Sequence, residues 1–279
     1  MKPRIIVDST TDLLPHLAEQ VHVIPMTLRF GDQEYIDGVT IDRQTFYQML
    51  IDSKEYPTTS QASPAKFAEE FEKAKEAGES AVVITVASKF SGTYQSARIA
   101  AEDYEDIYVV ESGTVAVGGG ILVERALELR EQGLSAKEIA EKLNEEKEKI
   151  VIVALVDTLE YLKRGGRVSK SVAFAGTLLN IKPLIAVIHG EVLMAGKARG
   201  TKQGNTLLLQ EIEKSGGVDF SKPVLLGYTG LTDASLLKFI EESRSVLADH
   251  LLQVRYTCIS SVMGTHAGPG AVAVAFFKQ

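Results

Sequence analysis

Short apolar runs alternate with amphipathic helical patterns through the first half of the chain. Runs rich in β-branched residues predict buried strands over residues 4–7, 81–86 and 107–110. Helical periodicity predicts helices over residues 12–19, 42–51, 92–102, 115–132 and 135–147, with one more beginning at Ser63-Pro64. Strands that alternate with helices indicate βαβ units, so this half is predicted to be a mainly parallel α/β domain.

The second half carries a different pattern. Two apolar runs, over residues 183–188 and 192–195, flank His189-Gly190-Glu191, which is typical of a hairpin. The other expected strands cover residues 151–156, 224–228, 251–259 and 271–277, with a polar loop between the last two; helices are expected over residues 158–163, 204–214 and 233–248. A hairpin beside longer crossovers predicts an α+β domain with an antiparallel or mixed sheet. We place the boundary near Asp157, between an N-terminal domain of residues 1–157 and a C-terminal domain of residues 158–279.

Some residues predict how helices begin and pack. Ser135 and Glu138 have the spacing of a capping box, and Thr40 is expected to cap the helix over residues 42–51. Gly118-Gly119-Gly120 lies inside a helical pattern. Close packing of that helix explains these glycines better than phosphate binding does.

Composition excludes several classes of protein. The chain has 279 residues, 45% of them hydrophobic and 24% charged, which is the balance of an ordinary globular protein. Its net charge of −7 argues against a nucleic-acid partner, because phosphates require a basic surface. The N-terminal apolar run is too short for a signal peptide, and polar residues interrupt the charge-free stretch over residues 256–277. We therefore expect no membrane span and a cytoplasmic location.

Motifs for common cofactors and metals are absent from the sequence. No G-x-G-x-x-G follows a strand, no H-E-x-x-H or G-x-S-x-G occurs, and the glycines before Lys197 have the wrong spacing for a phosphate loop. Cys258 is the only cysteine, so no internal disulfide or cysteine-based metal site is expected. It is predicted to be a small buried residue of a strand.

The segment around Ser91 is the most informative candidate site. It lies between the strand over residues 81–86 and the helix over residues 92–102, at the carboxyl end of a predicted parallel strand. Open α/β sheets bind ligands at such ends, and a helix N-terminus offers free N–H groups to an anion. The alternative is that Ser91 only caps the helix.

Three further segments combine polar side chains with turn residues. In residues 58–64, three hydroxyls and an amide precede the capped helix that begins at Ser63-Pro64, although these hydroxyls can simply satisfy their own backbone. Gly165-Gly166 ends a short helix and presents Arg167, in what is otherwise a solvated C-terminal turn. His266 lies in a glycine-rich, charge-free loop, which implies a close approach of the backbone, although a lone histidine is usually structural.

Together these segments resemble the DegV family, which includes the bacterial fatty-acid-binding subunits of the fatty acid kinase system. The matching motifs occur in family order over almost the whole chain: Ile6-Val7-Asp8-Ser9-Thr10-Thr11-Asp12-Leu13, Thr59-Ser60-Gln61, Phe90-Ser91-Gly92-Thr93-Tyr94, Tyr161-Leu162-Lys163-Arg164-Gly165-Gly166-Arg167 and His266-Ala267-Gly268-Pro269-Gly270. Two positions depart from the family. Ala62 stands where a proline is common, and residues 197–202 match the family's basic turn only in part.

The resemblance implies a fatty acid held between the two domains. It implies that Thr59 and Ser91 hold the carboxylate, with Arg167 and His266 near the head group. The full ligand-binding set that we expect is Thr59, Ser60, Ser91, Gly92, Thr93 and His266. Positive charge also clusters locally, and we expect a basic rim that docks a partner kinase and includes Arg167, Arg199 and Lys202.

The residue types suit an acyl ligand. Hydroxyl groups can donate charge-assisted hydrogen bonds to a carboxylate. A sixteen-carbon chain such as palmitate has about 14 methylenes, whose burial contributes ~11 kcal/mol before the costs of association. The candidates for the lining of the acyl site are Phe90, Phe174, Leu178, Leu179 and Met263.

Three functions are compatible with these residues. We expect a monomeric carrier without a cofactor or enzymatic activity, which presents a long-chain fatty acid to a separate kinase for acyl-phosphate formation. The first alternative is a serine hydrolase, with Ser91 as nucleophile, His266 as base and Asp8 as a conceivable third member. The second is a small anion- or nucleotide-binding module that holds no lipid.

Overall fold

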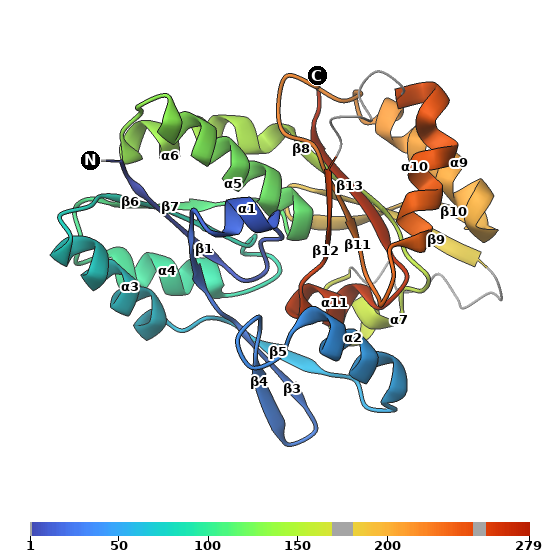
Figure 1. Ribbon diagram of the computed structural model, residues 1–279, viewed down its shortest axis with the longest axis horizontal. Coiled ribbons are helices and arrows are strands. Elements are labelled where there is room, and N and C mark those ends of the chain that lie inside the picture. The colour runs from blue at the N-terminus through green and yellow to red at the C-terminus, as the bar shows by residue number, and fades with distance from the viewer. Residues whose placement is uncertain (1, 169–180, 248–254) are drawn as a thin grey trace.

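A parallel sheet organises the N-terminal half of the protein (Figure 1). The computed structural model describes residues 2–168, 181–247 and 255–279. The sheet has the order β2-β1-β6-β7, and all of its pairs are parallel. Its strands are β1 (Arg4–Asp8), β2 (His22–Ile24), β6 (Ala81–Thr85) and β7 (Ile107–Glu111). The predicted parallel α/β architecture of this half is confirmed.

Helices cover both faces of the parallel sheet because alternate strand residues point to opposite sides. Ile6 and Val83 lie in one core cluster with residues of α3 (Pro64–Glu76) and α4 (Thr93–Ala101). Val7 and Ile84 lie in another with residues of α5 (Ala116–Glu131) and α6 (Ala136–Glu146). Two short helical turns of this half are α1 (Pro15–Ala18) and η1 (Lys147–Lys149).

A six-stranded mixed sheet forms the second half, in the order β10-β9-β8-β13-β11-β12. Its strands are β8 (Ile150–Leu155), β9 (Ile181–Ile188), β10 (Glu191–Arg199), β11 (Leu225–Tyr228), β12 (Arg255–Cys258) and β13 (Val272–Phe277). Only β11 and β12 pair in parallel, so the expected mixed sheet is confirmed. The predicted hairpin is β9–β10, and His189 and Gly190 both have positive φ at its turn, as two-residue hairpins favour. Strand β8 belongs to this sheet although it precedes the boundary expected near Asp157, and that boundary stays a prediction.

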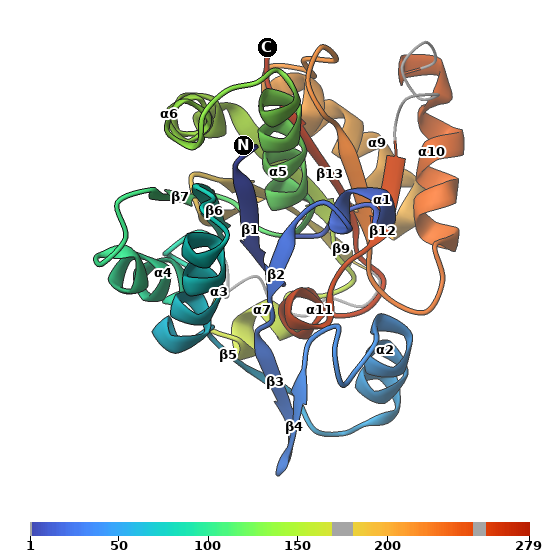
Figure 2. The same cartoon turned by 60° about the vertical axis from the view of Figure 1, so that its left-hand side comes forward.

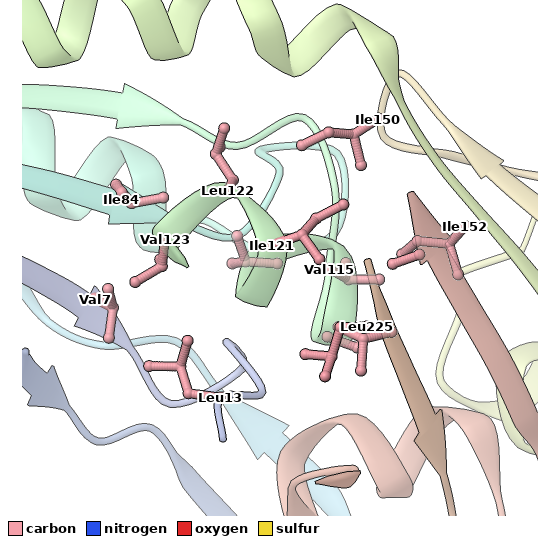
Figure 3. Close-up of a cluster of buried hydrophobic side chains, with 14 of the residues drawn as sticks. Val7, Leu13, Ile84, Val115, Ile121, Leu122, Val123, Ile150, Ile152 and Leu225 are labelled. Atoms are coloured by element: carbon pink, nitrogen blue, oxygen red, sulfur yellow. The ribbon is translucent and has the colours of Figure 1, made fainter. Parts of the chain in front are cut away.

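Helix α5 lies between the two sheets and joins their cores (Figure 2). Figure 3 shows Val7 and Ile84 from the parallel sheet and Ile152 and Leu225 from the mixed sheet gathered around it. The far face of the mixed sheet is covered by α9 (Gly200–Lys214) and α10 (Ala234–Leu247). None of the helices in the described ranges is long and apolar enough to cross a membrane.

A small third sheet was missed by the sequence analysis. It has the order β4-β3-β5 and is antiparallel, with β3 (Thr27–Phe30), β4 (Gln33–Ile36) and β5 (Thr58–Ser60). With α2 (Arg43–Asp52) it lies at the lower edge of the molecule in Figure 1, beside α7 (Glu160–Arg164) and α11 (Ser261–Ala267). Gly31-Asp32 between two alternating runs is a hairpin signal that could have revealed β3 and β4.

Several local predictions were wrong. Asp42, not Thr40, caps α2 by accepting a hydrogen bond from Thr45 N at 2.7 Å, and α1 begins only at Pro15. The polar loop expected before β13 contains helix α11. Cys258 ends β12 and is half-buried rather than buried. Residues 251–254 of the expected strand over residues 251–259 lie outside the described residues.

The three glycines of α5 allow close packing, as predicted. A Cβ on Gly120 would lie 2.1 Å from the backbone oxygen of Asp12, whereas one on Gly119 would meet Thr11 Oγ1 at 3.3 Å. Glycine to alanine normally stabilises a helix by roughly 1 kcal/mol. For Gly120→Ala we expect a loss of about 1–3 kcal/mol in the free energy of unfolding, because backbone atoms cannot give way. Urea unfolding measures this loss; Gly119→Ala is the control, and an equal effect of both changes would contradict it.

Candidate ligand-binding cavity

A cavity of about 410 Å³ lies between the mixed sheet and the loops that follow the parallel strands. This volume is within the range of small-molecule sites, roughly 300–1,000 Å³. The mixed sheet supplies an apolar wall of Ile152, Ala154, Ile185, Val187, Val192 and Ala273. Cross-strand pairing sets Ala273, Ala154 and Ile185 side by side on three neighbouring strands. The body of the cavity can therefore accept a hydrocarbon chain.

Polar groups gather at one part of the cavity wall. They come from four segments far apart in the sequence: β5, the turn before α4, the turn after α7, and α11. The lining residues are Thr59, Ser60, Gln61, Ser91, Gly92, Arg167 and His266. Five of the six residues expected to bind the ligand thus line the same cavity as Arg167, which was expected at the rim. The sixth, Thr93, is fully buried behind Ser91.

His266 and Thr59 form the central contact of this polar group. His266 Nε2 lies 3.0 Å from Thr59 Oγ1, across 207 positions of sequence. The residue is 8% exposed, and burial, with a smaller contribution from the charge of Arg167, lowers the pKa of His266 to about 4. The imidazole is therefore neutral at pH 7. His266 was expected in a loop but lies on helix α11, and a Cβ on Gly165 would meet its Nδ1 at 2.2 Å.

Ser91 stands in the turn between β6 and α4. Its backbone N–H donates to Ala87 O at 3.3 Å, and its Oγ lies 2.9 Å from Thr93 Oγ1. Thr93 N also donates to Ser91 Oγ at 3.3 Å, while the cap position itself is Gly92. A Cβ on Gly92 would lie 2.1 Å from Gln61 Oε1, so only glycine fits between α4 and the Gln61 side chain. Ser91 thus helps to begin the helix and also faces the cavity.

Arg167 reaches the cavity because α7 ends in a Schellman motif. Gly166 has a φ of 67°, its N–H donates to Lys163 O, and Arg167 N donates to Leu162 O. The guanidinium then donates to Phe90 O at 3.1 Å and to Gly165 O at 2.6 Å. These bonds connect the turn after α7 to the Ser91 turn.

Other predicted site residues lie elsewhere. Arg199 and Lys202 are exposed at the end of β10 and the start of α9, and neither lines the cavity. They were grouped with Arg167 by charge, but α9 covers the opposite face of the sheet. Phe90 and Met263 line the cavity as expected, whereas Phe174, Leu178 and Leu179 lie outside the described residues.

Sequence reasoning assigned no role to several lining residues, among them Gln61, Thr10 and Met26. Gln61 belongs to a recognised motif but was assigned no role. Thr10 also belongs to a recognised motif but was assigned no role, and Met26, which precedes β3, reaches the cavity only through the tertiary fold. Thr93 Oγ1 lies 3.8 Å from Met26 Sδ, which connects β3 to the Ser91 turn.

The contacts do not assemble the hydrolase alternative. His266 Nε2 pairs with Thr59 rather than Ser91. Asp8 accepts hydrogen bonds from Thr10 and from Val86 N, so it does not orient the histidine. Within the described ranges, no group of three or more His, Cys, Asp or Glu side chains is arranged to hold a metal ion.

The low pKa of His266 predicts a pH-dependent contribution to stability. Between about pH 6.5 and pH 4 the unfolded chain binds a proton that the folded histidine does not, so acid favours unfolding. This contribution is present above pH 6.5 and is lost as the pH falls to about 4, by ~3 kcal/mol in total. We expect the stability advantage of the wild type over His266→Gln to shrink by that amount between pH 7 and pH 4 in urea unfolding. A constant difference would contradict a buried, neutral His266; the titration of Asp12 is common to both proteins and cancels.

Comparison with known proteins identifies the family of this chain. A family model described as "Uncharacterised protein, DegV family" matches residues 2–279. A DegV domain-containing protein of Caldanaerobacter subterraneus subsp. tengcongensis is 34% identical over 284 aligned residues, which cover 100% of this chain and 99% of that protein. Among solved structures, a DegV family protein from Thermus thermophilus, described by its fatty acid binding, has a TM-score of 0.88 and 30% identity, with 100% of both chains covered. A stearic acid-binding protein from Eubacterium ventriosum has a TM-score of 0.85 and 29% identity, covering 99% of this chain and 98% of its own. Because the model spans nearly every residue and full-length relatives share a third of the sequence, the chain belongs to the DegV family.

Proposed function

We propose that this protein binds a long-chain fatty acid, such as palmitate, and presents its carboxylate to a partner fatty acid kinase. The observation that carries the proposal is one cavity in which an apolar wall meets a group of hydroxyls beside a neutral imidazole. The Thermus thermophilus and Eubacterium ventriosum proteins are described as binding fatty acids, as is a DegV protein from Bacillus subtilis with 27% identity. The proposal includes a cytoplasmic, monomeric carrier that uses no cofactor.

The head group is held by neutral donors and one cation. In the tautomer with a proton on Nε2, His266 donates to Thr59 Oγ1, which leaves the Thr59 hydroxyl proton for the ligand. Ser91 Oγ supplies a second donor from the neighbouring turn before α4. Arg167 adds positive charge beside them, and hydrogen bonds to a carboxylate are about twice as strong as neutral ones. A carboxylate could not be buried here without such donors.

The acyl chain supplies most of the affinity. Burial of each methylene contributes about 0.8 kcal/mol, so contact of a long acyl chain with the apolar wall contributes more to the binding free energy than the two hydroxyls do. The hydroxyls then decide which end of the ligand lies near the surface turns that carry Ser91 and Arg167. A carboxylate held there, rather than in the core, is accessible to a second protein.

The carrier role predicts that the protein has no turnover of its own. Incubation of the purified protein with palmitate, ATP and magnesium should give no acyl phosphate, and addition of a fatty acid kinase should produce it. Arg167→Ala should lower the kinase-dependent rate, whereas Arg164→Ala is the control because that side chain is bound by Glu160 and stacks on Tyr56. Mass spectrometry of the acyl products measures acyl phosphate formation with and without the kinase, for the wild type and for both variants. Acyl phosphate formed without the kinase would contradict the carrier role.

A further inference from the structure

Helix α11, which carries His266, takes its N-terminal caps from distant side chains. Its cap residue, Ser260, makes no side-chain capping bond. Instead Asp12 Oδ1 accepts from Ser260 N at 2.7 Å, and Asp37 Oδ1 accepts from Ser261 N at 3.3 Å. These bonds span 248 and 224 positions of sequence. The helix is thus attached to the N-terminal half at the end opposite His266.

Two residues of α2 secure the strand that leads into α11. Arg43 donates to Thr257 Oγ1 at 3.1 Å and to the backbone oxygen of Cys258, and its other nitrogen lies 3.3 Å from Asp12 Oδ1. Tyr47 Oη donates to Ile259 O at 3.0 Å. The junction of β12 and α11 is therefore held at consecutive residues by side chains from the N-terminal half.

The remainder of α11 is packed too closely to adjust on its own. A Cβ on Gly264 would lie 2.5 Å from Tyr47 Oη, and one on Gly268 would lie 2.2 Å from the ring of Tyr161. His266 follows Ser261 by five residues, which is ~7.5 Å along a helix at ~1.5 Å per residue. A displacement of the capped end therefore moves the imidazole relative to Thr59, and binding contacts of this kind tolerate little displacement.

The burial of two carboxylates, Asp12 and Asp37, to cap a short helix costs free energy. Both are buried, with Asp12 0% and Asp37 5% exposed. Burial raises the pKa of Asp12 to about 7, the charge of Arg43 lowers it, and the charge of Asp37 raises it further. Burial also raises the pKa of Asp37, while hydrogen bonds from Ser9 and Ser261 lower it. A serine or asparagine cap would satisfy the same N–H groups without placing two acids side by side in the core.

We propose that Asp12 and Asp37 are positioning residues, which hold helix α11 through the N–H groups of Ser260 and Ser261 so that His266 stays aligned with Thr59 on the ligand's carboxylate. They touch no ligand themselves, because neither lines the cavity. The two aspartates act on the head group through the position of α11. They are not part of the apolar wall of the mixed sheet, so its binding of the acyl chain is unchanged. The ligand part of this inference rests on the proposed function; the alignment of His266 does not.

The first test uses the ligand-free protein and so does not depend on fatty acid binding. NMR of the His266 ring, assigned with His266→Gln, follows its titration in the wild type, Asp37→Ala and Asp12→Ala, which lack the oxygens that accept from Ser261 N and Ser260 N. We expect the variants to titrate closer to 6.5 than the wild type's value of about 4, because a displaced α11 admits water to the ring. Ser135→Ala, which removes a capping box from the distant helix α6, is the control for lost helix capping and should leave the titration unchanged. Identical titration of wild type and both aspartate variants would overturn the proposal.

The second test separates positioning from general loosening of the fold. Asp37→Ala, which removes the acceptor of Ser261 N, should weaken palmitate binding about 10-fold, with little change for hexadecanol, which has the same chain and no carboxylate. In the His266→Gln background the same change should lower the affinity for palmitate by less than about twofold, because the imidazole through which it acts is gone. Equal losses for palmitate and hexadecanol, or full additivity with His266→Gln, would assign the aspartates a merely structural role. If the wild type bound neither compound, the proposed function would fail and the ring titration would still decide on the positioning.

Discussion

Palmitate is expected to bind about 100-fold or more weakly when Thr59 and Ser91 are both replaced by alanine. Each hydroxyl contributes a hydrogen bond to a charged group, worth about 1.5–3 kcal/mol, and both line the cavity. The affinity for hexadecanol should fall much less, because its neutral hydroxyl forms weaker hydrogen bonds than a carboxylate does. Titration with a fluorescent fatty acid, followed by competition with each compound, measures the losses.

The control for this pair of substitutions is Thr58→Ala. Thr58 is the neighbour of Thr59 on β5, but it is exposed and does not line the cavity. Its replacement should leave the affinity for palmitate unchanged. Unchanged affinity in the double variant as well would show that the carboxylate lies elsewhere.

A bulky side chain at position 154 is expected to block the acyl chain. Ala154 lies in the middle of the apolar wall, between Ala273 and Ile185 on the neighbouring strands. Ala154→Phe fills space that the ligand needs, and loss of contact for half of a sixteen-carbon chain corresponds to ~5 kcal/mol, or several thousandfold in affinity. The loss should grow through the series Ala154→Val, Ala154→Leu and Ala154→Phe.

Chain length provides the internal control for this series. A short fatty acid occupies less of the apolar wall, so its affinity should fall by a smaller factor than that of palmitate. Thermal unfolding without ligand checks that each variant folds. A loss that is the same for short and long chains would mean that the wall formed by Ala154 does not hold the acyl chain.

The main architecture could be predicted from the sequence because its signals are local. The strands β1, β6 and β8 contain runs of buried Ile and Val, and such runs are recognisable without tertiary information. The capping box at Ser135 and Glu138 forms as expected. The small sheet of β3, β4 and β5 was missed because its strands have only three or four residues and carry many polar side chains.

The arrangement of the site depends on contacts between distant segments. Helix α11 was predicted to be a loop because its caps, Asp12 and Asp37, lie more than 200 positions away. The family resemblance named Thr59 and His266 together, but their contact of 3.0 Å is a product of the fold. Arg199 and Lys202 were grouped with Arg167 by charge, but neither of them lines the cavity. Periodicity within one segment carries no information on such relations.

Mass spectrometry of the purified protein tests the central claim most directly. The protein is measured first under native conditions, where a bound lipid adds to its mass, and then after denaturation, where a non-covalent ligand is released and identified by its own mass. We predict one fatty acid of about sixteen carbons or longer per chain, with the denatured protein at its sequence mass. A protein that carries no fatty acid and takes up none when palmitate is added, or one that retains an acyl adduct on Ser91 after denaturation, would contradict the account.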